Sequence, residues 1–555
     1  MGDGMNTDTS GNSRSFRVSD FGAVGDGATN DGPAVRRAIA AAVASGPGAT
    51  VNFDPVTYRL DHYKEADYHI PLRGTDGLTL EGNGAELLNA PTNGAFGLTD
   101  CRNVCIRGFC VDHAPYGDTQ GTIDAVNATA GHFDVQVHPG FPLPPHQEQV
   151  VKLAGSGPVG WAGWGAWAWG SVLDPVERRL RRDAAPHYFI DSVVPVPGSP
   201  GTYRVTVRDG SRAALGHVDI GDRFYLPLLF GSDGYEAETR GSNFEIVGSS
   251  HVRVEDVTFW SGRSGVAFWI VNNEGPLELS GIKVTFRPGT KRIVTTWRDG
   301  MHCMNNRVGP VVEGCFFEGL LDDSINLSAR TAMASRSFSP AEYEITGLMP
   351  FHIGDRVLVF DPRTNTVIAE TAVVDARPIE DERTRVLLAD ELEGVVHGEI
   401  VRDRDIESTH FYNMDRINRG FVVRNCRFGP QRRHAMLIRS VEGVMEGNTI
   451  DGVRGSAVSM GNEMGSFYEG PFPHDNVIRA NTIRACGSDP ITIYTSSIDG
   501  TAELTSNVSV VDNEVHLREG QEVAVRLTRV KNATVRDNRI TTADGHESDT
   551  AVVWG

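Results

Sequence analysis

The stretch that decides the fold is Val423-Arg-Asn-Cys-Arg-Phe428, because it returns as Met445-Glu-Gly-Asn-Thr-Ile450, Ile478-Arg-Ala-Asn-Thr-Ile483, Val510-Val-Asp-Asn-Glu-Val515 and Val535-Arg-Asp-Asn-Arg-Ile540. Earlier copies read Ile106-Arg-Gly-Phe-Cys-Val111, Val254-Glu-Asp-Val-Thr-Phe259 and Val312-Glu-Gly-Cys-Phe-Phe317. Successive C-terminal copies are offset by 22, 33, 32 and 25 residues. This spacing is typical of the coils of a parallel β-solenoid, each built from short strands and turns.

The asparagines of the repeat have a structural interpretation. Asparagine tolerates left-handed backbone geometry, and an inward-facing amide can hydrogen-bond the backbone of its own coil and of the next. Identical side chains stacked coil upon coil would then form a ladder. We therefore expect structural rather than catalytic roles for Asn448, Asn481, Asn513 and Asn538.

The N-terminal region predicts a cap over the open end of the solenoid. A strand and a glycine-rich loop at 16–32 precede Pro33–Ser45, an Ala-rich stretch that predicts a helix with Asp31 or Gly32 as N-cap and Gly46 as its stop. The segment DFGAVGDGATNDGPAVRRAI resembles the N-terminal signature of pectin-lyase-fold proteins, such as the polygalacturonases of glycoside hydrolase family 28. The resemblance implies an all-β, right-handed parallel β-helix. It says little about the reaction, because many activities share this fold.

Two segments interrupt the repeat, and alternating patterns with turns predict a small β-barrel or β-sandwich in each. Both contain Gly-Asp-Arg followed by a β run and a proline, at 221–227 and 354–362. The expected organisation is a flexible tail at 1–14, the cap and first coils at 15–114, module 1 at 115–240, central coils at 241–328, module 2 at 329–409 and C-terminal coils at 410–555.

The chemistry is expected between the two modules. Asp299 precedes Asp322 and Asp323 by 23 and 24 residues, which is one coil length. Residues one coil apart lie roughly 4.8 Å apart along the axis of a parallel β-helix. Crowding of three carboxylates raises at least one pKa, which supplies an acid and a base in one site. Glycoside hydrolysis needs such a pair.

The pattern Asp-Gly-x-His followed one coil later by Leu-x-Asp-Asp-x-Ile-Asn resembles glycoside hydrolase family 110. The family also has a β-helix interrupted by β-barrel domains, and the resemblance covers the chain from Phe16 to near its end. It implies an exo-acting, inverting α-galactosidase with α-1,3 specificity and with no metal or other cofactor. It also implies that Asp299, Asp322 and Asp323 carry catalysis. Our hypothesis makes Asp322 the general acid and gives the other two aspartates the task of positioning and deprotonating water.

Other side chains are candidates for binding the substrate. His302 and Asn326 follow the aspartates and are expected near them, whereas coils after module 2 should supply Arg439 and Glu463. Candidate stacking faces for galactose are Trp260, Trp269 and Trp297. Segment 461–474 breaks the repeat and predicts a long loop at the pocket rim. Module 1 holds Trp161, Trp164, Trp167 and Trp169, which fit a sugar-stacking loop, an oligomer contact or simple packing.

Composition excludes several classes of function. The net charge of −20 makes nucleic acid and anionic membranes poor partners, and no apolar run is long enough to span a bilayer. Seven cysteines without a CxxC pair predict buried, reduced thiols rather than disulfides or a structural zinc site. The N-terminus has no signal-peptide pattern, which leaves a cytoplasmic protein or one secreted with its leader removed. The expected partner is a glycan with terminal α-galactose, and a homo-oligomer stays open.

Three alternatives remain on the same fold. A polygalacturonase-like hydrolase would use a similar aspartate triad. A polysaccharide lyase would need a Lys or Arg base and often Ca²⁺, which three aspartates could bind, but the sequence shows no obvious basic clamp beside them. A non-catalytic, tailspike-like glycan-binding β-helix would not depend on the aspartates at all.

Overall fold

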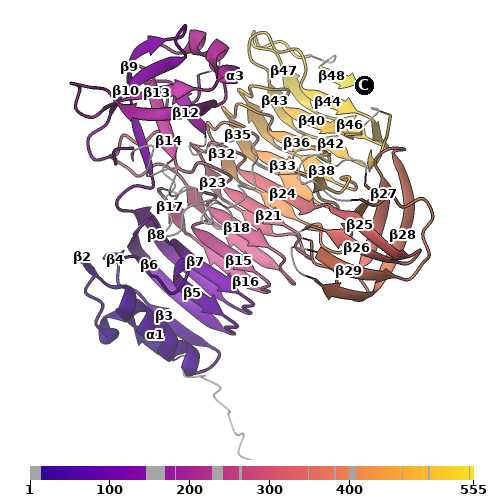
Figure 1. The fold of residues 1–555 in the computed structure, drawn as a ribbon, viewed down its shortest axis with the longest axis horizontal. Coiled ribbons are helices and arrows are strands. Elements are labelled where there is room, and N and C mark those ends of the chain that lie inside the picture. Colours follow the sequence, from indigo (N-terminus) through magenta and orange to yellow (C-terminus); the bar gives the residue numbers. More distant parts are fainter. Residues whose placement is uncertain are drawn as a thin grey trace, which may run out of the picture.

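The computed structural model describes residues 14–144, 169–181, 183–227, 242–261, 265–347, 349–379, 383–398, 408–464, 467–497, 501–548 and 551–555. The chain winds into a parallel β-helix whose coils stack from the N-terminal helix to the C-terminus (Figure 1). Three ladders of parallel strands form its faces. The predicted fold class, a parallel β-helix interrupted by two small β-barrels, is confirmed.

One face carries the candidate site and is called the site face below. Its strands pair in parallel in chain order. They are β5 (Tyr68–Arg73), β7 (Gly94–Thr99), β15 (Phe244–Val247), β18 (Phe268–Val271), β21 (Met301–Met304), β24 (Ile325–Arg330), β33 (Met436–Ile438), β36 (Val458–Met460), β40 (Ile491–Tyr494), β44 (Val525–Thr528) and β48 (Val552–Trp554).

The second and third faces share two long strands, β6 (Leu78–Asn89) and β8 (Cys105–His113). The second face adds β1 (Ser15–Arg17), β3 (Ala49–Asn52), β16 (Val252–Glu255), β19 (Leu277–Ser280), β22 (Val311–Glu313), β31 (Val422–Arg424), β34 (Val444–Glu446), β38 (Val477–Arg479), β42 (Ser509–Val511) and β46 (Thr534–Arg536). The third adds β2 (Asp26–Asn30), β4 (Thr57–Leu60), β17 (Thr258–Phe259), β20 (Lys283–Val284), β23 (Phe316–Phe317), β32 (Arg427–Phe428), β35 (Thr449–Asp451), β39 (Thr482–Arg484), β43 (Glu514–His516) and β47 (Arg539–Thr541). A short parallel pair, β41 (Thr505–Ser506) and β45 (Val530–Lys531), lies outside these ladders.

Each interruption folds as a closed six-stranded antiparallel barrel. Barrel 1 consists of β9 (Asp118–Asn127), β10 (His132–Val137), β11 (Trp169–Leu173), β12 (Tyr188–Pro195), β13 (Thr202–Val207) and β14 (Arg223–Pro227). Barrel 2 consists of β25 (Ala332–Ser339), β26 (Glu342–Thr346), β27 (Arg356–Asp361), β28 (Thr366–Pro378), β29 (Arg383–Leu388) and β30 (His410–Asn413). Strand β30 lies where the β-helix was expected to resume, but it pairs with β25 and β27 and so closes barrel 2.

The asparagine ladder forms as predicted. Nδ2 of Asn448 donates to Oδ1 of Asn481 at 3.0 Å, and Asn481 donates in the same way to Asn513 at 2.9 Å, as does Asn513 to Asn538. One detail of the prediction was wrong, because the left-handed residue of each turn is the one before the asparagine. These residues are Gly447, Ala480, Asp512 and Asp537.

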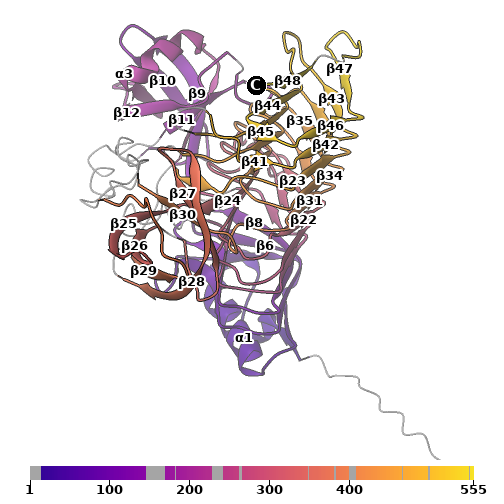
Figure 2. The same cartoon turned by 90° about the vertical axis from the view of Figure 1, so that its right-hand side faces the viewer.

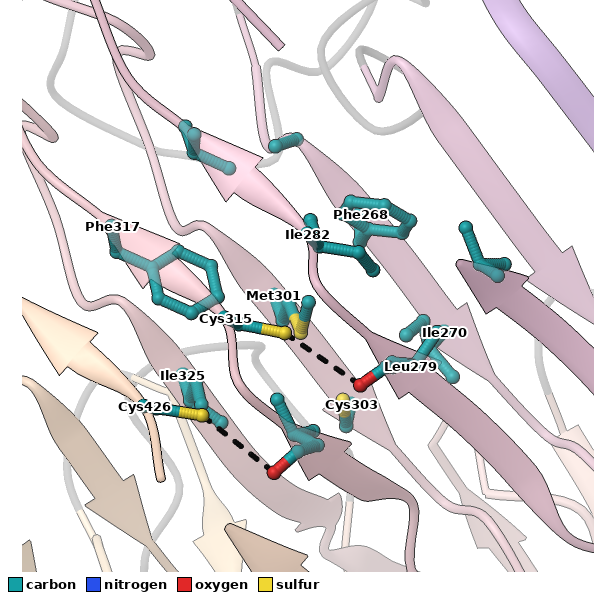
Figure 3. Close-up of a cluster of buried hydrophobic side chains, with 14 of the residues drawn as sticks. Phe268, Ile270, Leu279, Ile282, Met301, Cys303, Cys315, Phe317, Ile325 and Cys426 are labelled. Carbon is teal, nitrogen blue, oxygen red and sulfur yellow. Dashed lines mark hydrogen bonds between the residues drawn. The ribbon is translucent and has the colours of Figure 1, made fainter. Parts of the chain in front are cut away.

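The core of the β-helix is a continuous apolar column (Figure 3). Met301, Cys303 and Ile325 point into it from the site face, and Cys315 and Cys426 enter from turns on the opposite side. The Sγ atoms of the last two cysteines each lie 3.6 Å from a backbone carbonyl of the preceding coil. All seven cysteines are free, and all but the half-buried Cys110 are buried, largely as the sequence predicts.

Helix α1 (Gly32–Ala44) covers the N-terminal end of the column, close to its predicted limits. Asp31 stands at the N-cap position, but its carboxylate makes no capping bond. It accepts hydrogen bonds from the backbone N–H groups of Val24 and Gly25 instead, at 2.6 and 3.1 Å, and so fastens the glycine-rich loop to the helix. Within the described residues, no helix combines the length and apolar character needed to cross a membrane.

Candidate active site

Three aspartates meet just before strands β21 and β24 of the site face. Met301 pairs with Ile325, so Asp299 and Asp323 hold equivalent positions in adjacent coils. Carboxylate oxygens of Asp299, Asp322 and Asp323 all lie within 4.8 Å of one another. The structure therefore brings together the three side chains that the one-coil spacing singled out.

Two of the three carboxylates are buried and held by backbone. The N–H of Asp323 donates to Oδ1 of Asp299 at 3.1 Å, and the N–H of His434, one coil later, donates to Oδ1 of Asp323 at 2.8 Å. Oδ2 of Asp299 lies 2.6 Å from Nδ1 of His302. The side chain of Asp322 is 30% exposed, so it is the member of the group that a substrate reaches first.

Burial sets the protonation of the two inner carboxyls. It raises the pKa of Asp299 above its usual value, against the opposing hydrogen bond to His302. Burial raises the pKa of Asp323 well above its usual value, and the neighbouring charges of Asp322 and Asp299 add to the rise. Protons in the free site are therefore favoured on the buried pair.

Two arginines flank Asp322 and correct the expectation that no basic clamp stands beside the aspartates. Nη2 of Arg432 donates to Oδ1 of Asp322 at 3.0 Å, and Nε of Arg433 lies 3.8 Å from the same oxygen. Both arginines follow β32 and reach the site from the next coil. The oxygens that could bind a cation thus already face two guanidinium groups and His302.

A stacked pair of rings lies beside the aspartates. Trp269, His302 and Asn326 are register partners on β18, β21 and β24, and strand alternation turns all three away from the core. The rings of Trp269 and His302 are stacked, with centroids 4.7 Å apart and planes 18° apart. Within the described part of the chain, Nε2 of His302 and Oδ1 of Asn326 are buried without a hydrogen-bond partner. These two atoms are therefore available to a ligand.

A glutamate that the sequence analysis missed completes this group. Glu469 lies on β37 (Glu469–Gly470), which pairs antiparallel with the end of β24. Its carboxylate accepts a 2.7 Å hydrogen bond from Nη1 of Arg439, and both side chains are buried. Burial opposes ionisation of Glu469, but Arg439, Arg330, His302 and a hydrogen bond from Asn326 outweigh it and lower the pKa. The predicted Glu463 instead accepts a hydrogen bond from the backbone N–H of Phe467 in its own loop.

The other predicted tryptophans are placed less favourably for sugar binding. Trp297 is fully buried against Trp169, with ring centroids 5.2 Å apart, and presents no face to solvent. Trp260 is half-buried and covered by the guanidinium of Arg287, 4.7 Å from its ring centroid. Of the tryptophan cluster in module 1, only Trp169 belongs to the described residues; Trp161, Trp164 and Trp167 lie outside them.

The two barrels project from one side of the β-helix, as Figure 2 shows. In Figure 1 they stand on either side of strands β18, β21 and β24, which carry the site. Barrel 1 touches the site through Trp169 and His187, which both contact Arg432. On the other side, Met464 and Phe472 of the 461–474 loop pack against barrel 2. The aspartates thus lie between two walls supplied by the insertions.

Comparison with known proteins adds curated relatives of matching length. No protein-family model matches the chain. The chain is 22% identical to Alpha-1,3-galactosidase A of Bacteroides thetaiotaomicron over 91% of this chain and 88% of that protein. It is also 22% identical to Alpha-1,3-galactosidase B of the same organism, over 95% and 86% of the two chains. A shorter match to Alpha-1,3-galactosidase B of Akkermansia muciniphila is 28% identical over 40% of this chain and 27% of that one.

Among solved structures, the chain is similar to a mannuronan C-5 epimerase module of Azotobacter vinelandii, with a TM-score of 0.37 and 10% identity. The match covers 97% of this chain and 99% of the other. The family 28 exopolygalacturonase of Yersinia enterocolitica has a TM-score of 0.38, 13% identity and coverage of 96% and 79%. The chain's similarity in sequence is to alpha-1,3-galactosidases, over most of its own length and of theirs.

Proposed function

We propose that this protein is a glycoside hydrolase that releases terminal α-linked galactose from glycans, as an exo-acting, inverting, α-1,3-galactosidase-like enzyme. The observation that carries the proposal is the group of three carboxylates within 4.8 Å, two of them buried, in a chain similar to alpha-1,3-galactosidases over 91% of its length. In a non-catalytic glycan-binding solenoid, three carboxylates this close would destabilise the fold without serving any reaction.

The acid–base roles follow from accessibility. Asp322 is the exposed carboxyl and is the one that can reach the glycosidic oxygen, so it is the general acid. A proton favoured on Asp299 or Asp323 in the free site must pass to Asp322, directly or through a water, before Asp322 can act as the acid. Once ionised, a carboxylate of raised pKa is a stronger base, which suits the buried pair to deprotonating water.

An inverting mechanism requires a place for the attacking water beside the carboxylates. Inverting enzymes usually hold their two carboxyls about 6.5–9.5 Å apart, with the water between them. Here the oxygens approach within 4.8 Å. The water must therefore lie beside the group, held by Asp299 and Asp323, while Asp322 protonates the leaving oxygen. If no water fits there, the alternative is a retaining enzyme with a nucleophilic aspartate.

The polar wall next to the aspartates suits a neutral sugar. Nε2 of His302 and Oδ1 of Asn326 are two unpartnered polar atoms for hydroxyl groups, and the ionised Glu469 accepts from hydroxyls more strongly than a neutral group would. The half-buried Trp269, whose ring is stacked on His302, is the aromatic side chain beside them that a sugar ring could contact. The barrels on both sides favour access by a chain end rather than by the middle of a polymer, which supports exo action.

The test is incubation with Galα1-3Gal, a branched blood-group-B-type trisaccharide and polygalacturonate, followed by NMR of the first products. We expect free β-galactose from the first two substrates. An unsaturated uronide would assign a lyase, and saturated galacturonate would assign a polygalacturonase. Asp322→Asn should lose activity on the natural linkages, whereas Asp191→Asn, an exposed aspartate of barrel 1, should keep it.

A further inference from the structure

Arg432 connects barrel 1 to the aspartate group. Its guanidinium donates to Asp322 at 3.0 Å through Nη2 and to the carbonyl of Leu321 through Nε. Nη1 lies 3.3 Å from Nδ1 of His187, and the guanidinium carbon lies 4.6 Å from the centroid of the Trp169 ring. The side chain is only 7% exposed, so these protein contacts rather than water fix its orientation.

Both barrel residues are themselves held firmly. Trp169 is the first residue of β11, and His187 directly precedes β12. The His187 ring lies edge-on to Phe189, with centroids 4.7 Å apart, and 5.4 Å from the ring of Trp169. Trp169 also packs on Trp297, two residues before Asp299. Barrel 1 is thus anchored on both sequence segments that carry the catalytic aspartates.

The chemistry of the contact makes His187 an acceptor. A guanidinium only donates, so Nδ1 of His187 must be the unprotonated nitrogen, and Nε2 carries the proton. Burial and the charge of Arg432 lower the pKa of His187 to about 4, which keeps the ring neutral near pH 7. A neutral ring can satisfy Nη1 without repelling the cation.

We propose that barrel 1 is a positioning element of the active site: Trp169 and His187 hold the guanidinium of Arg432 against Asp322. The proposal rests on the function proposed above. In this arrangement the barrel does more than stand beside the aspartates, because it fixes the charge that faces the exposed carboxyl. His187 is a positioning residue, since it acts through Arg432.

The first test is kinetic. His187→Ala removes the acceptor of Nη1, which should lower kcat/KM by about tenfold. It should also move the alkaline limb of the pH profile upward, because a displaced Arg432 stabilises the ionised form of the general acid Asp322 less. His187→Gln offers an acceptor oxygen and should recover most of the loss. His217→Ala changes an exposed histidine of the same barrel and should match the wild type. An active wild type whose rate and pH profile are unchanged by His187→Ala would overturn the proposal.

A second readout does not depend on activity. With ¹³C-labelled histidine, NMR follows the titration of His187 in the wild type and in Arg432→Met. Removing the cation should raise the pKa of His187 from about 4 toward its ordinary value. No shift would refute the contact. If the wild type hydrolysed no galactoside but this titration moved as expected, the proposed function would fail while the link from barrel 1 to Arg432 stood.

Discussion

Replacing Asp323 by asparagine should stabilise the protein at neutral pH while it abolishes catalysis. Burial raises the pKa of Asp323 well above its usual value, and the nearby charges of Asp322 and Asp299 add to the rise. Asparagine has nearly the same shape and keeps an oxygen that can accept the N–H of His434, which now donates to the carboxylate at 2.8 Å. The substitution therefore removes a charge and leaves the backbone contact in place.

The magnitude follows from Coulomb's law and proton linkage. Two unit charges 4.8 Å apart repel by about 3.5 kcal/mol at an effective dielectric constant of about 20. The wild type can avoid the repulsion by keeping a proton, which at pH 7 costs at most about 4 kcal/mol for a group with an unfolded pKa of about 3.9. Attraction to Arg433 offsets part of this penalty. The expected gain in unfolding free energy is about 1–3 kcal/mol.

The pH dependence of the gain is the decisive signature. A carboxyl whose pKa is raised in the folded state contributes a penalty that is absent below the unfolded pKa and grows as pH rises toward the folded value. Calorimetric Tm values of Asp323→Asn should thus exceed those of the wild type more at pH 8 than at pH 5. Asp191→Asn, on an exposed strand position, should show no such trend. A lower Tm for Asp323→Asn at pH 8, or a gain equal at both pH values, would refute the reasoning.

Three other substitutions test separate parts of the molecule. Glu469→Gln leaves the buried Arg439 without its counter-charge, so it should lower the unfolding free energy by about 3–5 kcal/mol and remove much of kcat/KM. An unchanged Tm would contradict the pairing. Partial recovery of Tm in the double variant Glu469→Gln/Arg439→Met would support it. Trp269→Ala should raise the KM for an aryl α-galactoside roughly fivefold through the loss of about 1 kcal/mol of stacking, and an unchanged KM would exclude it from the sugar site. Asn481→Ala breaks the ladder and should lower the unfolding free energy by about 1–3 kcal/mol in thermal unfolding. Asn532→Ala, at an exposed position, should lower it less. Equal losses in the two variants would show that the ladder has no structural role.

The fold could be predicted because each coil of a β-helix repeats the same short sequence pattern. The Asn448 turn recurs in each C-terminal coil, and its amide contacts reach only the neighbouring coils, so the sequence period reports the spatial period directly. The same logic predicted the meeting of Asp299 and Asp323, whose separation is one coil. The end of barrel 2 was less predictable, since β30 joins it by antiparallel pairing that no repeat announces.

The rest of the site depends on long connections. The sequence analysis named Glu463 in the 461–474 loop as a binding residue. In the structure, Glu469 of the same loop lies beside Asn326 and Arg439, because β37 pairs antiparallel with the end of β24. His187 meets Arg432 across 245 residues of sequence through an inserted barrel, which has no signal in the coil pattern. Trp297 was a candidate stacking face for galactose, but packing against Trp169 of barrel 1 buries it.

The measurement that tests the central claim most directly compares Asp322→Asn with Asp323→Asn on two α-galactosides. One substrate has a dinitrophenyl leaving group that departs without protonation, and the other is Galα1-3Gal, whose leaving group needs a proton. If Asp322 is the acid, Asp322→Asn keeps much of its rate on the activated substrate and loses it on the disaccharide, while Asp323→Asn loses both. Two results would contradict the roles assigned to the three aspartates. One is an equal loss of activity on both substrates in Asp322→Asn, and the other is near wild-type turnover of Galα1-3Gal by either variant.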